Sequence, residues 1–452
     1  MGNGRDGVNE LIGKLWGEAK SPLYRNAIFL MENSVVGQAL GFFFWVIVAR
    51  VYADTDVGFA VTLFSTVSFA AALALLGQTV ALIRYLPETE DRIDLINTSM
   101  TLVGGATLFL TGGLLLVIAL FGLDLQFALE NPVYPVTMLA GALACTLGPI
   151  LDNSAIALRR SDMAMWRTVA LGVVKIPVAL VIALTLSTTL GVGRFGVFLA
   201  LVFSLVVSVL LQAFWLFPKV LPGYVPRIRI HFGRLRPLMR FSSGNYVATV
   251  VAAAGGSLLP LMILQVLGSA GPSNAAYFYV ASAVAGLLSV ISGAAFTSFY
   301  AEASYRDADR HRDERRALLL TLALLAPAII VFWVFARFVL LLFGGASSAY
   351  ADFATDPLRI LTLASIPAVA GNLLTTRVRV RRRTLPLIVG AAMTSGVSLG
   401  LGYVLLASNG ITGLSIAVVI GSAVAVPYYW FIARKSFEAE PLEPVDIALL
   451  ER

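Results

Sequence analysis

The sequence predicts an all-α polytopic membrane protein of about twelve transmembrane helices, in two pseudo-symmetric six-helix bundles with both termini cytoplasmic. Three observations support this fold class. Of the 452 residues, 58% are hydrophobic and only 13% are charged, whereas soluble domains carry about 25% charged residues. Apolar runs long enough to cross a bilayer recur from one end of the chain to the other. The basic residues concentrate in alternate loops between these runs.

The first 22 residues are predicted to form an amphipathic segment on the cytoplasmic surface. Charged residues interrupt every apolar run before Ser21, whereas a cleavable signal peptide needs an uninterrupted apolar core. The side chains of Leu11, Leu15 and Trp16 fall on one helical face. This pattern is typical of a helix that lies in the membrane interface.

Twelve apolar segments follow, and each is long enough to cross the ~30 Å hydrocarbon core as a helix. No polar stretch between them is long enough to fold as a separate domain. The predicted spans are residues 24–49, 57–85, 95–121, 133–158, 164–190, 194–217, 240–267, 275–301, 317–343, 356–376, 384–407 and 411–433.

The distribution of the 33 Lys and Arg residues predicts the orientation. With the N-terminus inside, 28 of them fall on the cytoplasmic side and Lys175 falls within a span, while Arg50, Arg194, Arg337 and Arg359 lie toward the outside. The short outer loops carry acidic residues instead. The positive-inside rule therefore predicts that both termini are cytoplasmic. Because the net charge of +7 arises from these loops, it indicates topology and no nucleic-acid partner.

The longest cytoplasmic loop divides the chain nearly in half. The predicted parts are the N-terminal segment 1–22, a first six-helix bundle 23–217, a basic linker 218–239, a second six-helix bundle 240–433 and a cytoplasmic tail 434–452. In each half a polar outer turn follows the first long span, ADTDVGFA at 53–60 and GPSNAAYF at 271–278. Six spans in each half predict parallel repeats that face each other around a central cavity.

The first half begins with a pattern that resembles a known family. The stretch VARVYADTDVGFA (Val48–Ala60), followed by LGQTVALIRYLPE (Leu76–Glu88), resembles the opening of bacterial and archaeal polysaccharide flippases. These are the lipid-linked oligosaccharide exporters of the multidrug/oligosaccharidyl-lipid/polysaccharide exporter (MOP) superfamily. In that pattern Arg50 closes the first span, Gly58 belongs to the turn, and Arg84-Tyr85 ends the second span.

The resemblance extends loosely over the whole chain. The second-half turn at Ala276-Tyr277 is similar to the family's repeat, whereas Asp54 stands where a proline is common. The resemblance implies that the substrate is a sugar chain on a polyprenyl diphosphate, turned from the cytoplasmic to the outer leaflet by alternating access for polysaccharide export. Such an anion needs a polar, cationic cavity between the halves, and membrane lipids around the protein for its tail.

Lys175 is the most informative candidate for substrate binding. It lies near the middle of the fifth span, where a lysine costs about 2.5–3.5 kcal/mol on insertion scales. Pro177 follows closely and permits a kink. Either Lys175 faces a water-filled cavity and receives the diphosphate, or it pairs with a carboxylate and holds helices together.

Five further positions complete the predicted substrate-binding set. Arg84, at the inner end of the second span, either meets the diphosphate at the cytoplasmic mouth or anchors the helix. Arg50 and Arg337 lie toward the outside, where they serve release or structure. Asn26 and Asn245 sit near the start of the first span of each half and could hydrogen-bond sugar hydroxyls.

Three positions are candidates for ion coupling. Glu32 lies about two turns into the first span, and Asp152, followed by Asn153, lies about 9 Å from the inner end of the fourth. Carboxylates at such depths bind a coupling proton or sodium ion in many secondary transporters. Equally, either acid could neutralise Lys175, Arg25 or Arg84.

The remaining motif search favours transport over catalysis. The chain contains no GxxxxGK phosphate loop, no HExxH, no convincing Ser-His-Asp set and only one cysteine, Cys145. We therefore expect no enzyme activity, no catalytic residue, no metal site and no cofactor. Three alternatives stay open: a cation-coupled multidrug exporter of the same superfamily, a permease for amino acids or nucleobases, and a glycan-processing membrane enzyme. The short outer loops disfavour the last of these.

Overall fold

The computed structural model describes residues 22–121, 125–186, 193–303, 310–344, 349–380 and 384–437. The predicted amphipathic segment at the N-terminus and most of the predicted tail lie outside these residues. The described residues form helices joined by short turns and contain no strand. The predicted all-α class is therefore confirmed.

The α-helices follow the predicted spans closely. In chain order they are α2 (Pro22–Val51), α3 (Asp54–Ala74), α4 (Gln78–Tyr85), α5 (Arg92–Phe121), α6 (Val133–Ala157), α7 (Ser161–Val181), α9 (Gly196–Leu211), α10 (Phe217–Val220), α11 (Phe232–Ser257), α12 (Leu259–Leu267), α13 (Gly271–Ala303), α14 (Arg310–Val334), α15 (Ala336–Gly344), α16 (Ala349–Leu363), α17 (Ser365–Val380) and α18 (Leu385–Phe437). Two π-helical turns, η2 (Ile182–Leu186) and η4 (Gln212–Leu216), extend α7 and α9.

The described helices account for twelve crossings of a membrane. Ten segments are long and apolar enough to span it, if α14 and α15, which bend by 61°, count as one. Two of the ten, Ser242–Ser289 and Leu385–Arg434, have 48 and 50 residues, about twice what one crossing needs. Each turns back midway, at Gly268 and at Gly410, where φ is positive. In α18 the two arms pack antiparallel, because Gly390 faces Tyr429 and Gly402 faces Leu414.

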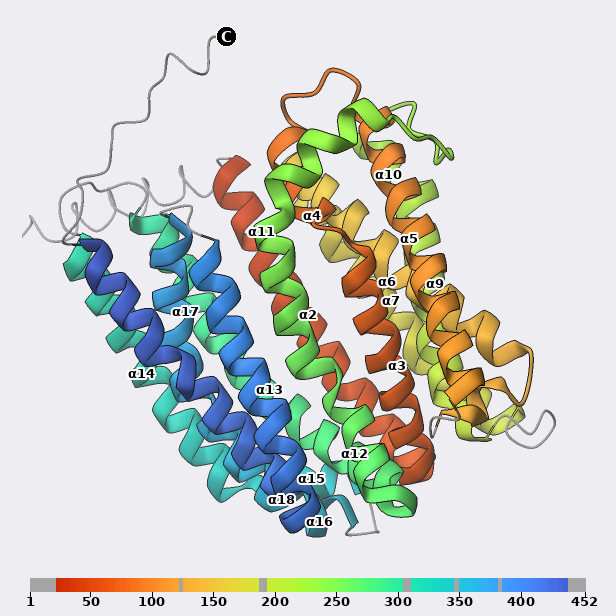
Figure 1. Cartoon of the computed structure of the whole chain (residues 1–452), viewed down its shortest axis with the longest axis vertical. Coiled ribbons are helices and arrows are strands. Elements are labelled where there is room, and N and C mark those ends of the chain that lie inside the picture. The colour runs from red at the N-terminus through yellow and green to blue at the C-terminus, as the bar shows by residue number, and fades with distance from the viewer. Residues whose placement is uncertain are drawn as a thin grey trace, which may run out of the picture.

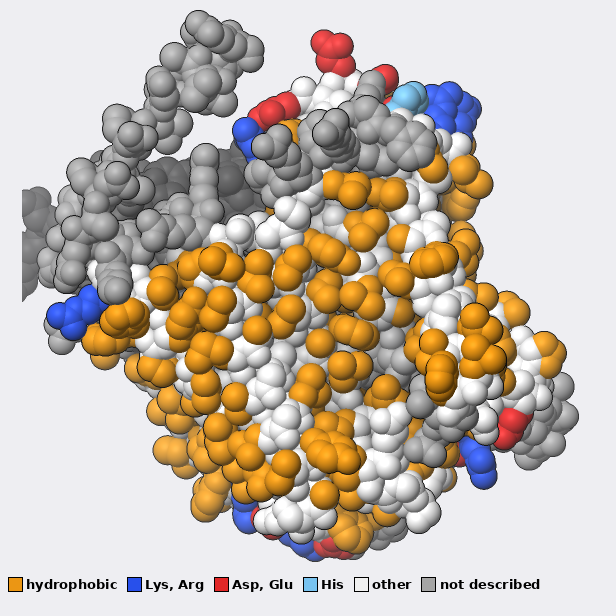
Figure 2. All heavy atoms as spheres, in the orientation of Figure 1, with side chains coloured by type: hydrophobic (Ala, Val, Ile, Leu, Met, Phe, Trp, Pro, Cys, Tyr) orange, Lys and Arg blue, Asp and Glu red, His pale blue; other side chains and the backbone are white. Residues whose placement is uncertain are grey.

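The surface agrees with a multi-pass membrane protein. In Figure 2 hydrophobic side chains cover the middle of the visible face, while charged side chains gather at its two ends. Large apolar side chains such as Phe109, Leu184 and Phe338 are more than 60% exposed. Lipid acyl chains solvate such side chains well, whereas water does not.

The chain folds as two bundles that face each other. Figure 1 shows α13 to α18 on one side of the molecule and α3 to α9 on the other, with α2 and α11 between them. We call residues 22–220 the first half and residues 232–437 the second half. The basic end is the end that carries the turns 86–91, 158–160 and 221–231, and the opposite end carries the turns 52–53 and 268–270. The positive-inside rule predicts that the basic end is cytoplasmic.

The second span is broken between α3 and α4. Leu76 and Gly77 both have positive φ there, 48° and 72°, so the helical hydrogen-bond ladder is interrupted. A carbonyl left free in a bilayer must find another donor. The carbonyl of Leu73 accepts one from the Tyr246 hydroxyl of α11, at 2.6 Å. The break in the first half is therefore closed by the second half.

Candidate functional site

Lys175 lies in the middle of the fifth span. It is fourteen residues from the start of α7 at Ser161, or about 21 Å along the helix axis. Its side chain is buried, and its Nζ lies over the ring of Phe44 of α2, 5.0 Å from the ring centroid. A cation over an aromatic face is stabilised by the ring quadrupole, but less than by a carboxylate.

Lys175 has no ion-pair partner among the residues that the structure describes. No described carboxylate lies within 4.0 Å of its Nζ. A buried lysine without a counter-ion costs several kcal/mol unless water or a ligand solvates it. The paired-lysine alternative from the sequence thus finds no support in the described part of the chain.

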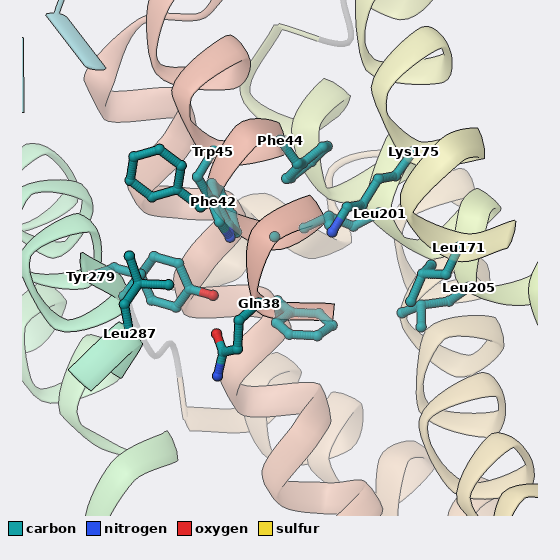
Figure 3. A pocket seen from close by; sticks show the side chains of 13 residues that line it. Gln38, Phe42, Phe44, Trp45, Leu171, Lys175, Leu201, Leu205, Tyr279 and Leu287 are labelled. Carbon is teal, nitrogen blue, oxygen red and sulfur yellow. The ribbon is translucent and has the colours of Figure 1, made fainter. Parts of the chain in front are cut away.

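The Lys175 side chain opens into a cavity of about 230 Å³ between the two halves. Lys175, Tyr279 and Gln38 line this space from three different helices, and Figure 3 shows the Tyr279 hydroxyl near the Gln38 amide, with the Lys175 amine apart from them. The first half contributes α2, α3, α7 and α9, and the second half contributes α13. The lining residues are Gln38, Gly41, Phe42, Phe44, Trp45, Phe64, Leu171, Lys175, Leu201, Leu205, Tyr279, Ala283 and Leu287.

Aromatic rings from both halves meet beside the cavity. Trp45 of α2 packs edge-on against Tyr279 of α13, with centroids 4.8 Å apart. Phe42 of α2 packs in the same way against Phe343 of α15, at 5.4 Å. Such pairs contribute about 0.5–1.5 kcal/mol each beyond the area they bury. They join the halves between the cavity and the opposite end.

The arginines predicted to bind substrate lie outside the cavity. Arg84 pairs with Glu88 on the surface of the basic end, at 2.7 Å. Arg337 pairs with Asp352 at 2.9 Å near the opposite end. Arg50 donates from Nε to the carbonyl of Leu342 in the second half, at 2.6 Å. Their roles in binding stay predictions, although Arg50 clearly bridges the halves.

The two asparagines and Glu32 are also outside the cavity lining. Asn245 is half-buried on α11, and its carbonyl accepts a hydrogen bond from Thr249. The side chain of Asn26 lies outside the described residues. Glu32 is an exposed residue of α2. No observation here tests their predicted roles in sugar binding and ion coupling.

Asp152 takes part in a polar cluster inside the first half. It accepts hydrogen bonds from Arg167 Nε of α7, at 2.9 Å, and from Gln212 Nε2 of η4, at 2.8 Å. Neighbouring Asn153 donates to the carbonyl of Pro149 one turn back, at 2.8 Å. The sequence interpretation counted Arg167 among the cytoplasmic charges and did not consider it as the partner of Asp152.

Of the residues that line the cavity, the sequence analysis singled out only Lys175. Gln38, Trp45 and Tyr279 were not among its candidates. A glutamine in an otherwise apolar span is a signal that could have identified Gln38. The two aromatic residues carry no such signal, because aromatic side chains are frequent in every span.

Comparisons with known proteins agree on the fold. The inward-facing conformation of a multidrug resistance MATE family transporter of the MOP superfamily superposes with a TM-score of 0.66 and 16% identity, covering 91% of this chain and 98% of that one. The lipid II flippase MurJ in its inward closed conformation gives 0.65 and 14%, covering 92% and 88%. A MOP superfamily transporter from Pyrococcus furiosus, whose binding pocket has reversed polarity, gives 0.60 and 18%, covering 92% and 96%.

No protein-family model and no curated protein matches the sequence. The structural likeness nevertheless extends over nine-tenths of the chain. The chain therefore has the fold of the MOP superfamily transporters, as the resemblance of its sequence motifs predicted.

Proposed function

We propose that this protein is a MOP-type transporter that turns a polyprenyl-diphosphate-linked oligosaccharide across the cell membrane for glycan export. The observation that supports the proposal is Lys175. Its buried amine faces a cavity between the two halves, and no described carboxylate lies beside it. Such an amine attracts anions and repels cations. A diphosphate supplies the missing counter-charge.

The arrangement of the cavity suits an amphiphilic anion. The amine lies at mid-depth, and Gln38 and Tyr279 add hydrogen-bonding groups elsewhere on the cavity lining. Most of the remaining lining is apolar or aromatic. The polar groups suit the diphosphate and the first sugar, and the apolar wall suits the start of the lipid tail. Rocking of the two halves would then carry the head group from the basic end to the opposite end.

A cation-coupled multidrug exporter is the second candidate, and the aromatic lining favours it. Phe42, Phe44, Trp45 and Tyr279 present ring faces and edges that suit a flat lipophilic drug. Lys175 disfavours the candidate, because a cationic drug would meet an unpaired positive charge in a medium of low dielectric constant. Substrate charge therefore separates the two candidates.

The test is flipping of a fluorescent polyprenyl-diphosphate glycan in proteoliposomes that contain the purified full chain. Lys175→Met keeps the length and removes the charge, and Lys175→Arg keeps the charge. A hydrogen-bonded charge contributes about 1.5–3 kcal/mol, so we expect Lys175→Met to reduce flipping by about 10- to 150-fold. Lys175→Arg should retain most of the activity.

Two outcomes contradict the proposal. One is undiminished glycan flipping by Lys175→Met at equal protein abundance. The other is export of a lipophilic cation by the wild type, enhanced in Lys175→Met, without any glycan flipping. The second outcome would favour the multidrug exporter.

A further inference from the structure

The segment that joins the two halves is an extended strap on the surface of the first half. Helix α10 ends at Val220 and α11 begins at Phe232, and residues 221–231 between them form no helix. We call these residues the strap. They lie along the first three turns of α5, at the basic end.

Side chains of α5 hold the backbone of the strap in place. Asn97 donates from Nδ2 to the carbonyl of Val225, at 3.0 Å, and its Oδ1 accepts from the Arg227 amide, at 3.3 Å. The asparagine amide thus substitutes for the backbone of a neighbouring strand. The amide of Arg229 donates to the Thr101 hydroxyl, at 3.1 Å.

Asp94 and Tyr224 fix the two ends of the strap. The buried carboxylate of Asp94 pairs with His231 Nδ1 at 2.8 Å and with Arg229 at 3.5 Å. Tyr224 is buried, packs against Phe217 with ring centroids 4.7 Å apart, and points its hydroxyl at the sulfur of Met100. These contacts along the strap fix the path of its backbone. The side chains that point away from α5 therefore stay exposed.

The fastened strap holds apolar side chains away from the protein. Ile228 is 91% exposed, and Val225 and Ile230 are nearly half exposed. On the adjoining η4, Phe214 and Trp215 are also exposed. An isolated exposed isoleucine needs no explanation, but these side chains continue the lipid-facing surface of the bundle, which suits insertion among acyl chains.

Two exposed basic side chains accompany these apolar side chains. Arg227 is exposed beside Ile228, and Lys219 lies with its Nζ 3.7 Å from the centroid of the Trp215 ring. From Phe217 to His231 the chain has three Lys and Arg residues and neither Asp nor Glu. In Figure 2 the blue basic side chains and the pale-blue histidine at the upper right lie directly above orange hydrophobic ones. A basic row above an apolar row matches the order of an anionic head group and its acyl chains.

We propose that the strap is a docking site for anionic phospholipid, in which Lys219 and Arg227 bind the head-group phosphate and Ile228 inserts between the acyl chains. The bound lipids would belong to the leaflet at the basic end. The proposal is independent of the proposed transport function, because it concerns lipid that stays in place and a surface remote from Lys175.

The test is titration of the purified full chain in detergent with phosphatidylglycerol and, separately, with phosphatidylcholine, read by native mass spectrometry. Each basic residue near an anionic lipid contributes about 1 kcal/mol, or about fivefold in affinity. We expect Arg227→Gln to weaken phosphatidylglycerol binding about fivefold, and Arg227→Gln with Lys219→Gln about thirtyfold. Arg159→Gln is the matched control, because Arg159 is exposed at the same end but lies off the strap.

Two further measurements distinguish binding of a lipid from binding of a free anion, and the contribution of apolar insertion from that of charge. Ile228→Ser should weaken binding of the lipid, and Ile228→Leu should retain it. Inorganic phosphate should not displace the lipid at equal concentration, since it lacks acyl chains. Equal phosphatidylglycerol affinity of wild type and the Arg227→Gln, Lys219→Gln variant would overturn the proposal, as would equal affinity for phosphatidylcholine. Full displacement by inorganic phosphate would also overturn it.

Discussion

The two ends of the molecule are joined in different ways. At the opposite end a single buried apolar core contains residues of both halves, among them Phe44 and Val57 of the first and Ile263, Tyr277 and Leu340 of the second. At the basic end the described buried residues form separate cores. One lies wholly within residues 81–224, and two lie within residues 288–433.

Polar contacts between the halves follow the same division. At the opposite end the Tyr277 hydroxyl donates to the Asp54 carboxylate, and Arg50 donates to Leu342. On the basic side of the molecule, α11 meets the break in the second span through Tyr246, and through Ser242, which lies against Gly77. Separating the halves at the opposite end would expose large buried side chains at about 1.5–3 kcal/mol each. The described contacts at the basic end carry little of that cost, so the structure is closed at the opposite end and easier to part at the basic end.

The largest expected effect comes from Gly58→Ala, which tests the closed end directly. Gly58 of α3 lies against the backbone carbonyl of Pro272 in the second half, and an added Cβ would overlap that oxygen. Backbone at a helix start cannot move aside as a side chain can. We expect the two polar turns to separate and the halves to part at the opposite end. The measurement is labelling of Ala276→Cys, in a Cys145→Ala background, by a membrane-impermeant maleimide.

Ala276 is fully buried in the wild-type arrangement, so labelling should be slow there and fast in Gly58→Ala. Gly105→Ala is the control, because nothing lies within 4 Å of a Cβ at that position of α5. Size-exclusion chromatography in detergent shows whether the variant is folded. A folded Gly58→Ala protein with wild-type labelling would contradict the idea that close backbone contact holds this end shut.

The next largest effect is on the stability of the first half at the basic end. The buried core there contains residues of the first half and of the linker that follows it. Asp152 and Arg167 are 15% and 13% exposed, and removing one partner of such a buried pair costs about 3–5 kcal/mol. We expect Asp152→Asn to lower the thermal unfolding temperature markedly, and Asp152→Asn with Arg167→Gln to recover part of the loss. Glu88→Gln is the control, since the Arg84–Glu88 pair is half exposed and should contribute less than about 1 kcal/mol. Equal effects of Asp152→Asn and Glu88→Gln would show that the cluster does not stabilise this half.

Whether the sequence predicts such a feature depends on how far apart along the chain the residues that form it are. Span positions and the depth of Lys175 within its span are local properties of hydropathy and charge, and the helices lie where those properties predict them. The pairing of Asp152 with Arg167 depends on how α6 packs on α7. One signal was nevertheless present: the two residues lie five and six positions from the facing ends of these antiparallel helices, Ala157 and Ser161, and hence at similar depth.

Other features required the tertiary structure. The contact of Trp45 with Tyr279 joins residues more than two hundred positions apart, and no local pattern selects those two aromatic residues among the many. The strap had been predicted as a basic linker, but its attachment to Asn97 and Thr101 depends on the path of the chain over α5. The two polar turns at 53–60 and 271–278 were recognised as similar, and the structure adds that they lie against each other.

The smallest effects provide the most direct comparison, because the same change can be made at two contacts between the halves. Tyr277→Phe removes a hydrogen bond to a carboxylate at the opposite end, worth about 1.5–3 kcal/mol, whereas Tyr246→Phe removes one to a neutral carbonyl at the break between α3 and α4, on the basic side, worth about 0.5–1.5 kcal/mol. We expect Tyr277→Phe to increase labelling of Ala276→Cys by about tenfold or more, and Tyr246→Phe to leave it unchanged or lower it. If Tyr246→Phe increased that labelling as much as Tyr277→Phe, the two ends would open together, and the rocking of two halves about a central cavity would have to be abandoned.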